Sequence, residues 1–536
     1  MNFKNQHPVK TPFLVATGDD IVETDVLIIG GGVTGTGIAR DLTLRGLNVI
    51  LIEKSDLNAG ASGGNHGLLH SGARYVCSDP EAAVECSTES EILKKNVGHC
   101  IEETGGLFVA VKGDKENYIA DFPDMCKKYG IPSEKIDPKE AREMEPSLSD
   151  ETIAVYKVND ASINPFKLSI ENINDAVSRG ACYLSHTRIE AFKIENKAIV
   201  YARVRNQISG KTHKIKAKTY VNATGAWAGS IAAMAGIHIN MVFSKGSLLV
   251  TSKRITKRAI NRLRKPTDGD ILVPGGVVSI LGTTSVRIKS PDNIYPTVKE
   301  VDYIISEGEK MIPELKTCRY IRAYAGVRPL VSMGKDNDRD VSRGFTLLDH
   351  EKDQVNNLIT ITGGKLSTYR LMAEKTSDIV CKKHQVSVEC RTKMIPLPST
   401  HSGEWSEPGV LVNDPFKPDT LEDPFLCECE MVPASAINTV IDSIKKNGGK
   451  PDLSSIALRT RIGKGPCQGA FCSMRILSHL YARGEIMDQT GINDLKYFLN
   501  ERWKGEQSLL WGQALVQSSL KEMIHCGLFG LELVKK

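Results

Sequence analysis

The sequence has no long hydrophobic run and little net charge. No stretch approaches the roughly 18 consecutive apolar residues that a membrane-spanning helix needs. Near the start, the apolar run Phe13–Ala16 is too short for the apolar core of a signal peptide. We therefore expect a cytoplasmic chain that contacts a membrane only peripherally. The 69 basic and 64 acidic side chains leave a net charge of +5 over 536 residues, too little to favour nucleic acid as a partner.

Aromatic side chains are few, at 6% of residues, while 41% of residues are hydrophobic and 25% charged. This is the composition of an ordinary globular protein, and it excludes a disordered or fibrous chain. At about 150 residues per domain, the length predicts roughly three or four domains. The 13 cysteines are an odd number in a long chain without a secretion signal, which favours reduced thiols or metal ligands over disulfides.

Proline is concentrated in one segment. Six of the 23 prolines lie between Pro396 and Pro424, and proline removes backbone donors and blocks regular pairing, so this segment is predicted to be a linker. The predicted parts of the chain are an extension (1–22), a large body (23–394), the linker (395–424), a cysteine-containing domain (425–484) and a helical tail (485–536).

The body shows the pattern of a mixed α/β protein. Val26–Ile29 and Val49–Ile52 are short apolar runs suited to buried parallel strands, and Thr34–Arg45 between them is a plausible crossover helix. Two alternating segments, Ala198–Gln207 and Lys211–Val221, predict a hairpin. Further strand-like segments lie between residues 271 and 288, which indicates antiparallel additions to the parallel unit.

A glycine-rich turn follows the first predicted strand. Residues 30–35 read GGGVTG and fit the pattern G-x-G-x-x-G, directly after Val26–Ile29 and before the predicted helix. Glu53 ends the next strand, 23 residues after Gly30. A nucleotide-binding fingerprint requires this strand, turn, helix and acidic residue together. The alternative is a glycine-rich turn that binds nothing.

Each residue of this fingerprint has a physical role. Gly30 permits the tight turn, Gly32 lets the backbone approach a pyrophosphate, and Gly35 lets the helix pack close to the strand. The helix N-terminus offers unpaired N–H groups to the phosphates. The Glu53 carboxylate can accept hydrogen bonds from ribose hydroxyls.

Two distant segments favour FAD over NAD. The segment 221–227, with Ala223 and Gly225, places a second glycine turn after a strand. The segment 362–365, with Gly363 and Gly364, precedes a predicted helix over Thr368–Cys381. No second G-x-G-x-x-G is present, so one nucleotide site that recruits distant segments suits a long cofactor such as FAD.

Three stretches resemble the FAD-dependent glycerol-3-phosphate dehydrogenases. Residues 60–75, GASGGNHGLLHSGARY, look like the flavin-contacting loop of that family. Residues 325–330 (AGVRPL) and 363–370 (GGKLSTYR) match two other stretches. The similarity is greatest to the anaerobic branch of the family, and it extends from about residue 22 to residue 532, including residues 498–505, FLNERWKG. The resemblance implies FAD contacts at Ala61, Ser62, Gly67, Gly363, Gly364 and Thr368.

The resemblance also implies the substrate-binding residues. Arg74, Arg328 and Lys365 occupy matching motif positions, and such cations suit a phosphorylated alcohol because they do not titrate near neutrality. Arg343 is a weaker third arginine. Tyr75 either lines the pocket or only packs. His70 is the candidate base for the hydroxyl proton, since histidine titrates in the useful range, although a single loop histidine is more often structural.

One position departs from part of the family. The aerobic members carry a lysine where this chain has Gly67, which agrees with the anaerobic branch. With Gly67 at this position, the loop also resembles that of FAD-dependent oxidases and dehydrogenases of 2-hydroxy acids. An FAD-dependent 2-hydroxy-acid dehydrogenase or oxidase, for example of L-2-hydroxyglutarate, is therefore the alternative interpretation. A second alternative is an iron–sulfur carrier whose flavin body is only a scaffold.

Four cysteines near the C-terminus form a C-x-C and a C-x₄-C pair. They are Cys427, Cys429, Cys467 and Cys472, with 37 residues between the pairs and a predicted helix among them. Four thiolates suit an iron–sulfur cluster or zinc, but structural zinc usually takes C-x₂₋₄-C at both ends. The arrangement resembles the [2Fe–2S] domain of bacterioferritin-associated ferredoxin. Zinc and free thiols remain alternatives.

Together these features predict an α/β protein with a Rossmann-type FAD-binding domain, an inserted mixed-sheet substrate domain and a small C-terminal helical iron–sulfur domain. The expected FAD-binding segments are about 23–80, 180–230 and 340–385, and the expected substrate-domain segments about 81–179 and 231–339. The expected reaction oxidises sn-glycerol 3-phosphate to glycerone phosphate by hydride transfer to flavin N5. The resemblance implies onward electron transfer to B and C partner subunits and a membrane quinone.

Overall fold

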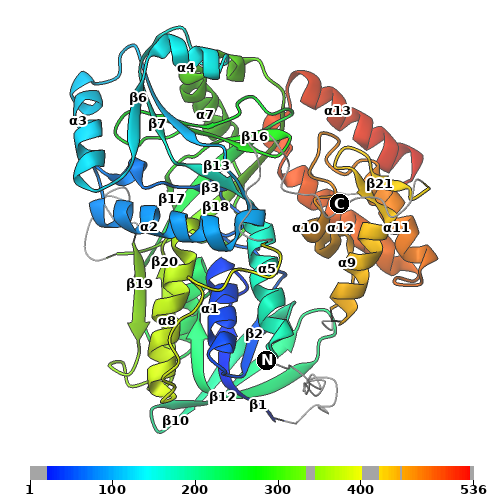
Figure 1. Cartoon of the computed structure of the whole chain (residues 1–536). Helices are drawn as coiled ribbons and strands as arrows, with labels where there is room; N and C mark the ends of the chain where they lie inside the picture. The colour runs from blue at the N-terminus through cyan, green and yellow to red at the C-terminus, as the bar shows by residue number, and fades with distance from the viewer. Residues whose placement is uncertain (1–20, 333–343, 401–421, 447–448, 532–536) are drawn as a thin grey trace.

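The computed structural model describes residues 21–332, 344–400, 422–446 and 449–531. Two large β-sheets form the body, one above the other, and a set of helices from the C-terminal part of the chain lies beside them (Figure 1). The α/β class predicted from the sequence is therefore confirmed.

The first sheet has eight strands and contains the predicted parallel unit. Its strands are β1 (Ile21–Ile29), β2 (Val49–Ile52), β9 (Cys182–Leu184), β10 (Thr187–Glu195), β11 (Ala198–Asn206), β12 (Thr212–Asn222), β19 (Phe345–Asp349) and β20 (Leu358–Gly363). β1 pairs in parallel with β2 and β12, and β12 pairs in parallel with β20. The predicted hairpin is β11 and β12. Because β1 begins at Ile21, residues 21 and 22 belong to the sheet and not to an extension.

Helices cover one face of this sheet. They are α1 (Val33–Leu44), α5 (Pro165–Ser178) and α8 (Tyr369–Lys383), the first and third at the positions predicted for helices. A buried ion pair of 2.8 Å between Arg40 of α1 and Asp175 of α5 joins two of them. On the opposite face, Leu27 and Ile50 pack with residues of β10 to β12 and of α6 (Ala228–Ala233). Both faces are covered here, which is why Val26–Ile29 of β1 and Val49–Ile52 of β2 are continuous apolar runs.

The second sheet has nine strands. They are β5 (Gly106–Val111), β6 (Ser133–Ile136), β7 (Thr152–Val158), β13 (Met241–Thr251), β14 (Ala259–Arg262), β15 (Ile271–Gly275), β16 (Val278–Gly282), β17 (Val286–Ile288) and β18 (Tyr320–Val331). The strand segments predicted between residues 271 and 288 are β15, β16 and β17. Helix α7 (Val298–Met311) buries Val301 and Ile304 against this sheet, and it starts at a capping box of Thr297 and Glu300.

Further elements complete the body. α2 (Pro80–Asn96) and a three-stranded sheet of β3 (Leu68–Leu69), β4 (Ile101–Glu102) and β8 (Ala161–Ile163) belong to the connections between the two large sheets. α3 (Glu116–Lys128) packs on β6 and α4 (Pro138–Met144) on β7 of the second sheet. β3 belongs to the stretch 60–75, so its pairing with β8 anchors the predicted flavin loop between the two large sheets (Figure 1).

The C-terminal part is a helical domain with one hydrophobic core. Its elements are β21 (Phe425–Cys427), β22 (Val432–Pro433), α9 (Ala434–Lys446), α10 (Leu453–Thr460), α11 (Cys472–Ala482), α12 (Gln489–Lys504) and α13 (Gly512–Glu522). Ile441 of α9, Ile476 of α11 and Phe498 of α12 are buried in the same cluster. The expected boundary at residue 484 therefore divides a continuous core, because α12 packs on the helices before it.

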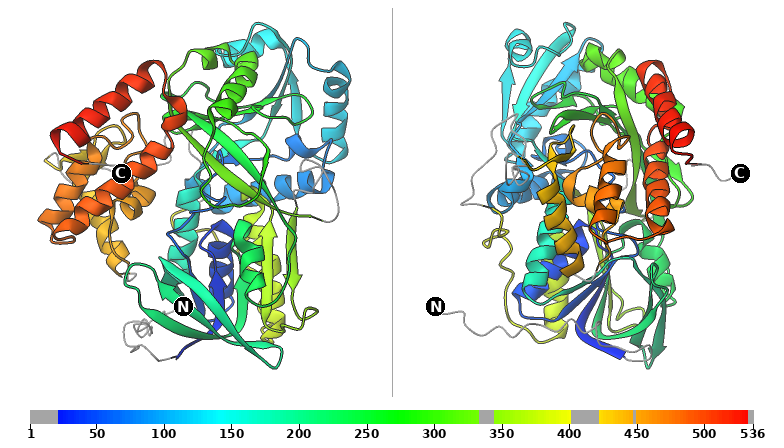
Figure 2. Two further views of the ribbon diagram at one scale, coloured as in Figure 1. Left: turned by 180° about the vertical axis from the view of Figure 1, so that it is seen from behind. Right: turned by 90° about the vertical axis from the view of Figure 1, so that its right-hand side faces the viewer.

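This domain packs directly on the body, as both views in Figure 2 show. Arg459 of α10 forms a half-buried ion pair of 2.7 Å with Asp56, which follows β2. The N–H of Ala323 in β18 donates to the carbonyl of Gly505, just after α12, at 2.7 Å. The C-terminal domain thus contacts both sheets of the body.

Candidate active site

One large cavity lies between the two sheets. Its volume is about 2220 Å³, well above the roughly 300–1,000 Å³ of a typical small-ligand pocket. The wall combines the β1–α1 turn, the end of β2, the stretch 59–66, the end of β12, β18 and the β20–α8 connection. Asp452 and Tyr497 of the C-terminal domain also line it. Segments far apart in the sequence therefore meet at a site large enough for a dinucleotide.

The glycine turn has the geometry of a phosphate-binding loop. Gly30 has φ +115°, and a Cβ there would lie 2.6 Å from the carbonyl oxygen of Ala223. A Cβ on Gly35 would lie 2.0 Å from the carbonyl oxygen of Gly30. The turn therefore tolerates no side chain at either position, and it directs the first-turn N–H groups of α1 to the cavity.

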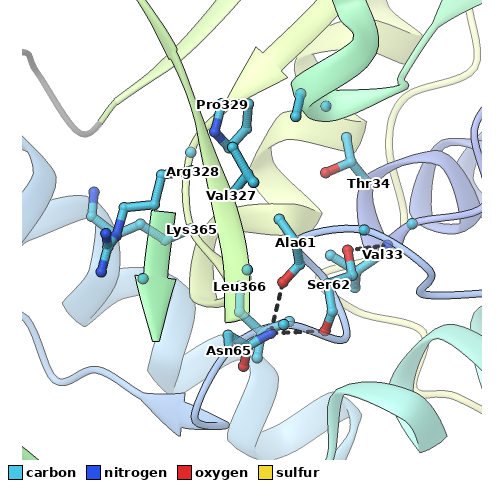
Figure 3. Close-up of a pocket in the computed structure, with 18 of the residues that line it drawn as sticks. Val33, Thr34, Ala61, Ser62, Asn65, Val327, Arg328, Pro329, Lys365 and Leu366 are labelled. Atoms are coloured by element: carbon cyan, nitrogen blue, oxygen red, sulfur yellow. Dashed lines mark hydrogen bonds between the residues drawn. The ribbon is translucent and has the colours of Figure 1, made fainter. Parts of the chain in front are cut away.

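Glu53 and Ser62 complete this end of the cavity. The N–H groups of Gly31 and Ser55 donate to the two carboxylate oxygens of Glu53, at 2.7 and 2.9 Å. Burial raises the pKa of Glu53, and these two donors oppose that rise. The N–H of Val33 donates to the Ser62 hydroxyl at 3.0 Å (Figure 3). A carboxylate has lone pairs for further donors, so Glu53 can still accept from a ribose.

Cations gather at another part of the cavity wall. Arg328 of β18 and Lys365 after β20 lie together in Figure 3, away from Val33 and Ser62. Nη1 of Arg328 donates to the carbonyl oxygen of Thr284 at 3.0 Å. Nη2 of Arg74 pairs with Asp270 at 3.3 Å, while its Nη1 is shielded from solvent and has no hydrogen-bond partner within the described part of the chain. Arg74 therefore has an unused donor in the cavity.

Two histidines and a tyrosine lie among these cations. The ring centroids of His70 and Tyr75 are 5.2 Å apart, and Tyr75 Oη lies 3.5 Å from His70 Nε2. Lys365 Nζ lies 4.8 Å from the centroid of the Tyr75 ring. His66 lies 6.0 Å from His70, centroid to centroid. Burial, and next the charges of Arg74 and Arg328, lower the pKa of His66 to about 3, so this ring is neutral at working pH.

The cavity brings together most residues predicted for the site. Those that line it are Gly30, Gly32, Glu53, Ala61, Ser62, His70, Arg74, Tyr75, Ala223, Gly225, Arg328, Gly363, Gly364 and Lys365. Gly35 lies behind the wall, where it allows the close packing predicted for it. Gly67 and Thr368 do not line the cavity, contrary to expectation. Arg343 lies outside the described residues.

Local backbone geometry explains these two exceptions. Gly67 has φ +69°, and a Cβ there would lie 2.7 Å from the Ile163 carbonyl oxygen, so the glycine serves the loop itself. The buried Thr368 hydroxyl accepts from the N–H of Lys365 at 3.1 Å and thereby shapes the turn that carries this lysine. His66, by contrast, was missed, although its place four residues before His70 in the same loop was a usable signal.

The four C-terminal cysteines lie next to one another. Cys429 Sγ is 3.8 Å from Cys427 Sγ and 3.9 Å from Cys467 Sγ, and Cys472 contacts both Cys427 and Cys467. Hydrogen bonds within the group lower the pKa of Cys427 and Cys467 and raise that of Cys429 and Cys472. In the described ranges, no three or more His, Cys, Asp or Glu side chains are arranged to hold a single metal ion.

Glycine makes room for this group of thiols. A Cβ on Gly465 would lie 2.5 Å from Cys429 Sγ, and one on Gly463 would lie 2.6 Å from the Phe498 ring. The loop before Cys467 can therefore approach Cys429 only because it lacks side chains at these positions.

Comparison with known proteins agrees with this geometry. Residues 25–374 match the family described as FAD dependent oxidoreductase. The A subunit of the anaerobic glycerol-3-phosphate dehydrogenase of Escherichia coli (strain K12) is 42% identical, over 96% of this chain and 99% of that protein. The A1 subunit of the anaerobic glycerol-3-phosphate dehydrogenase of Haloferax volcanii is 38% identical, over 93% of this chain and 89% of that protein.

The fold also has a solved counterpart. The X-ray structure of the glycerol-3-phosphate dehydrogenase from Bacillus halodurans complexed with FAD matches with a TM-score of 0.62, over 90% of this chain and 95% of that one. At 20% identity this match shows the fold alone. Over the described residues, no helix is both long and apolar enough to cross a membrane.

Proposed function

The chain belongs to the family of FAD dependent oxidoreductases, and we propose that it is the catalytic component of an anaerobic glycerol-3-phosphate dehydrogenase, which oxidises sn-glycerol 3-phosphate to glycerone phosphate. The observation that carries this proposal is the cationic group Arg74, Arg328 and Lys365 on the wall of a dinucleotide-sized cavity. Near-complete coverage of both named relatives supports the same assignment.

The residues around the glycine turn fit FAD. Gly30 and Gly32 leave space for a pyrophosphate at the N-terminus of α1, and Glu53 accepts from the adenosine ribose. Ala61, Ser62, Gly363 and Gly364 line the path between this end and the cations. When bound, FAD supplies the hydride acceptor at flavin N5.

The cationic end of the cavity fits a phosphorylated alcohol. Arg74 Nη1 is a buried guanidinium donor without a partner in the described structure, and a phosphate oxygen would satisfy it. Arg328 and Lys365 lie together (Figure 3) and line the same cavity as Arg74, so phosphate and substrate hydroxyl can be held at the same time. These contacts position C2 of the substrate and keep the phosphate charge compensated.

His70 is the proposed base. Oxidation at C2 removes a hydride from carbon and a proton from the hydroxyl oxygen, and the His70 ring accepts that proton; Tyr75 Oη lies 3.5 Å from its Nε2 and helps to orient the ring. His66 is a poor alternative, because burial, and next the charges of Arg74 and Arg328, lower its pKa to about 3 and oppose its protonation. We assign His66 to binding the substrate as a neutral ring.

The four cysteines are proposed to bind a [2Fe–2S] cluster. Four thiols in mutual contact are the donor set of such a cluster, which holds its thiolates in pairs on two irons. Structural zinc usually takes C-x₂₋₄-C at both ends, and the C-x-C pair of Cys427 and Cys429 departs from that spacing, so the cluster is favoured over zinc. When bound, the cluster supplies a one-electron carrier next to a two-electron flavin.

The proposal also includes a physiological electron acceptor and partner subunits. The named relatives are lettered components of larger enzymes, which supports an assembly with further subunits that we identify as B and C. The two electrons from the substrate would reach a quinone, which takes up two protons on reduction. Membrane contact is then peripheral and passes through those partners.

An anaerobic visible spectrum of the purified chain tests these assignments. Addition of sn-glycerol 3-phosphate is expected to bleach the flavin bands, whereas L-2-hydroxyglutarate should leave them oxidised. If glycerol 3-phosphate leaves the flavin oxidised and 2-hydroxyglutarate bleaches it, the chain is a 2-hydroxy-acid enzyme. If no substrate of either class bleaches it, the flavin body is a scaffold.

The variant Cys429→Ser tests the cluster separately. It should remove the iron–sulfur absorbance and leave flavin bleaching by substrate intact, because the thiol lies outside the flavin cavity. Cys526→Ser in the same domain is the matched control and should keep the absorbance. Absorbance that survives in Cys429→Ser contradicts the proposed ligand set.

A further inference from the structure

Three arginines lie where the C-terminal domain meets the body. They are Arg319, Arg322 and Arg502. None has a carboxylate within ion-pair distance in the described ranges. Of the nearby carboxylates, Glu501 pairs with Lys504 at 2.5 Å and Glu506 with Lys521 at 2.6 Å. Glu430 pairs with Arg461 at 2.9 Å through Oε2, while its buried Oε1 has no hydrogen-bond partner among the described residues.

Several nitrogens of these cations are also unsatisfied. Arg319 Nε, Arg322 Nη1 and Arg502 Nε are shielded from solvent, and none has a hydrogen-bond partner among the residues that the structure describes. Burial lowers the pKa of Arg322. Burial, and next the charge of Arg322, lower the pKa of Arg502 to about 9. Shielded cations without counter-charges are costly in a protein, so an anion is expected close by.

The cations surround the segment that carries one cysteine of the thiol group. Arg502 Nη1 donates to the Gly463 carbonyl oxygen at 3.0 Å, and Arg319 Nη2 donates to the Pro466 carbonyl oxygen at 3.4 Å. Lys464 lies between these two contacts in the sequence, and Cys467 follows directly.

We propose that Arg319, Arg322 and Arg502 compensate the negative charge of the group bound by the four cysteines and favour its reduced form. This inference rests on the proposed cluster. Four thiolates give a [2Fe–2S] group a net negative charge, and each electron added makes it more negative by one. Nearby cations stabilise the reduced form more than the oxidised one, because Coulomb attraction grows with the charge.

Strand β18 connects these cations to the cavity. Arg322 lies near its start, and Arg328 near its end lines the cavity. Between them, Tyr324 Oη donates to the carbonyl oxygen of Asn65 in the flavin loop at 2.7 Å. Arg322 therefore stands on a strand that also contacts the flavin loop and carries a residue of the cavity wall.

A potentiometric titration followed by electron paramagnetic resonance tests the proposal. Arg322→Gln and Arg502→Gln should each lower the midpoint potential of the cluster, with at least a tenfold change in the reduced-to-oxidised ratio at a fixed potential, or about 59 mV for one electron. Arg322→Lys should restore most of the shift. Arg483→Gln removes the same charge from the surface of the domain, where Arg483 pairs with Asp442, and should leave the potential unchanged.

Iron and sulfide content separates the other outcomes. An unchanged potential with full iron content in both glutamine variants overturns the proposal and leaves the cluster assignment intact. If Arg322→Gln loses iron while Arg322→Lys retains it, charge compensation is needed to hold the anionic group, which supports the proposal. Equal loss in both variants indicates a packing role and overturns it. Wild-type protein without iron or sulfide overturns the proposed cluster itself.

Discussion

Arg74 is the cavity residue with the clearest unmet hydrogen-bonding capacity. Its Nη2 pairs with Asp270, and its Nη1 is shielded from solvent without a hydrogen-bond partner in the described structure. The resemblance of its loop to the family motif implied a substrate cation, but only the structure shows which nitrogen lacks a partner. The same holds for Glu53, whose carboxylate is fixed by two backbone donors before any ribose is present.

At this scale we predict that Arg74→Gln weakens substrate use. The loss of one charge-assisted hydrogen bond costs about 1.5–3 kcal/mol, or roughly a 10- to 150-fold decrease in kcat/KM for sn-glycerol 3-phosphate, mainly through KM. Steady-state kinetics with an artificial acceptor measures this change. Arg264→Gln is the control, because Arg264 binds the same Asp270 without lining the cavity. A KM equal to wild type in Arg74→Gln contradicts phosphate binding by Arg74.

At the scale of elements, the loop between α10 and α11 brings Cys467 to the other three cysteines of the group. It carries Gly463, Gly465 and Cys467, and the next helix begins at Cys472. The C-x₄-C spacing was readable in the sequence. Cys429 precedes α9, so both α9 and α10 separate it from this loop in the sequence. Whether the loop reaches Cys429 depends on how these helices pack on α12.

We predict that Gly465→Ala prevents binding of the metal cluster. The added Cβ would lie 2.5 Å from Cys429 Sγ, so the loop or the thiol must move. Iron and sulfide per chain should fall to a small fraction of wild type, while FAD content stays normal. Gly527→Ala, at a position with open space around the Cβ, should retain full iron. Full iron content in Gly465→Ala shows that this close approach is not needed.

Helix α12 gives the C-terminal domain a specific pH dependence. Burial, and next the charge of Asp452, raise the pKa of Asp494 on α12 from 3.8 to about 7. Between about pH 4 and 7 the folded domain therefore keeps a proton that the unfolded chain has released. Stability then falls as pH rises through this range, and the loss is complete above pH 7.

The variant Asp494→Asn should remove this part of the pH dependence. Its side-chain oxygen can still accept from the N–H of Leu453, as Asp494 does at 2.9 Å. Thermal unfolding should show a higher Tm than wild type at pH 8 and a similar Tm at pH 4. Asp442→Asn, at an exposed ion pair, serves as the control. A Tm difference that is the same at both pH values contradicts the raised pKa.

At the scale of the whole molecule, one ion pair joins the C-terminal domain to the nucleotide-binding sheet. Burial alone would raise the pKa of Asp56, but the charge and hydrogen bonds of Arg459 hold it below its ordinary value. Tyr183 Oη also donates to Asp56, at 3.0 Å. Asp56 lies three residues after Glu53, so this contact fixes the C-terminal domain close to the cavity.

We predict that Arg459→Ala loosens the contact between the domain and the body. The substitution leaves the shielded Asp56 carboxylate without its cation. Such a loss lowers the free energy of unfolding by about 3–5 kcal/mol for a buried pair, and by less here because the pair is partly exposed. In stopped-flow spectra, substrate should still bleach the flavin, while cluster reduction slows. Arg483→Ala removes an exposed pair and should behave as wild type. Unchanged cluster reduction in Arg459→Ala means that this contact does not set the domain position.

The sequence by itself determined the nucleotide-binding unit, because a strand, a glycine turn, a helix and Glu53 are contiguous and their geometry is local. Family motifs also identified most of the cavity wall. Sequence alone did not show that Gly67 and Thr368 shape the backbone instead of lining the cavity. It also did not show that α12 belongs to the cysteine domain, that Arg322 of β18 contacts α12, or that Arg502 of α12 contacts the loop that leads to Cys467. Those features depend on which side chains are brought together from distant segments, and this is decided only when the two sheets and the C-terminal helices pack on one another.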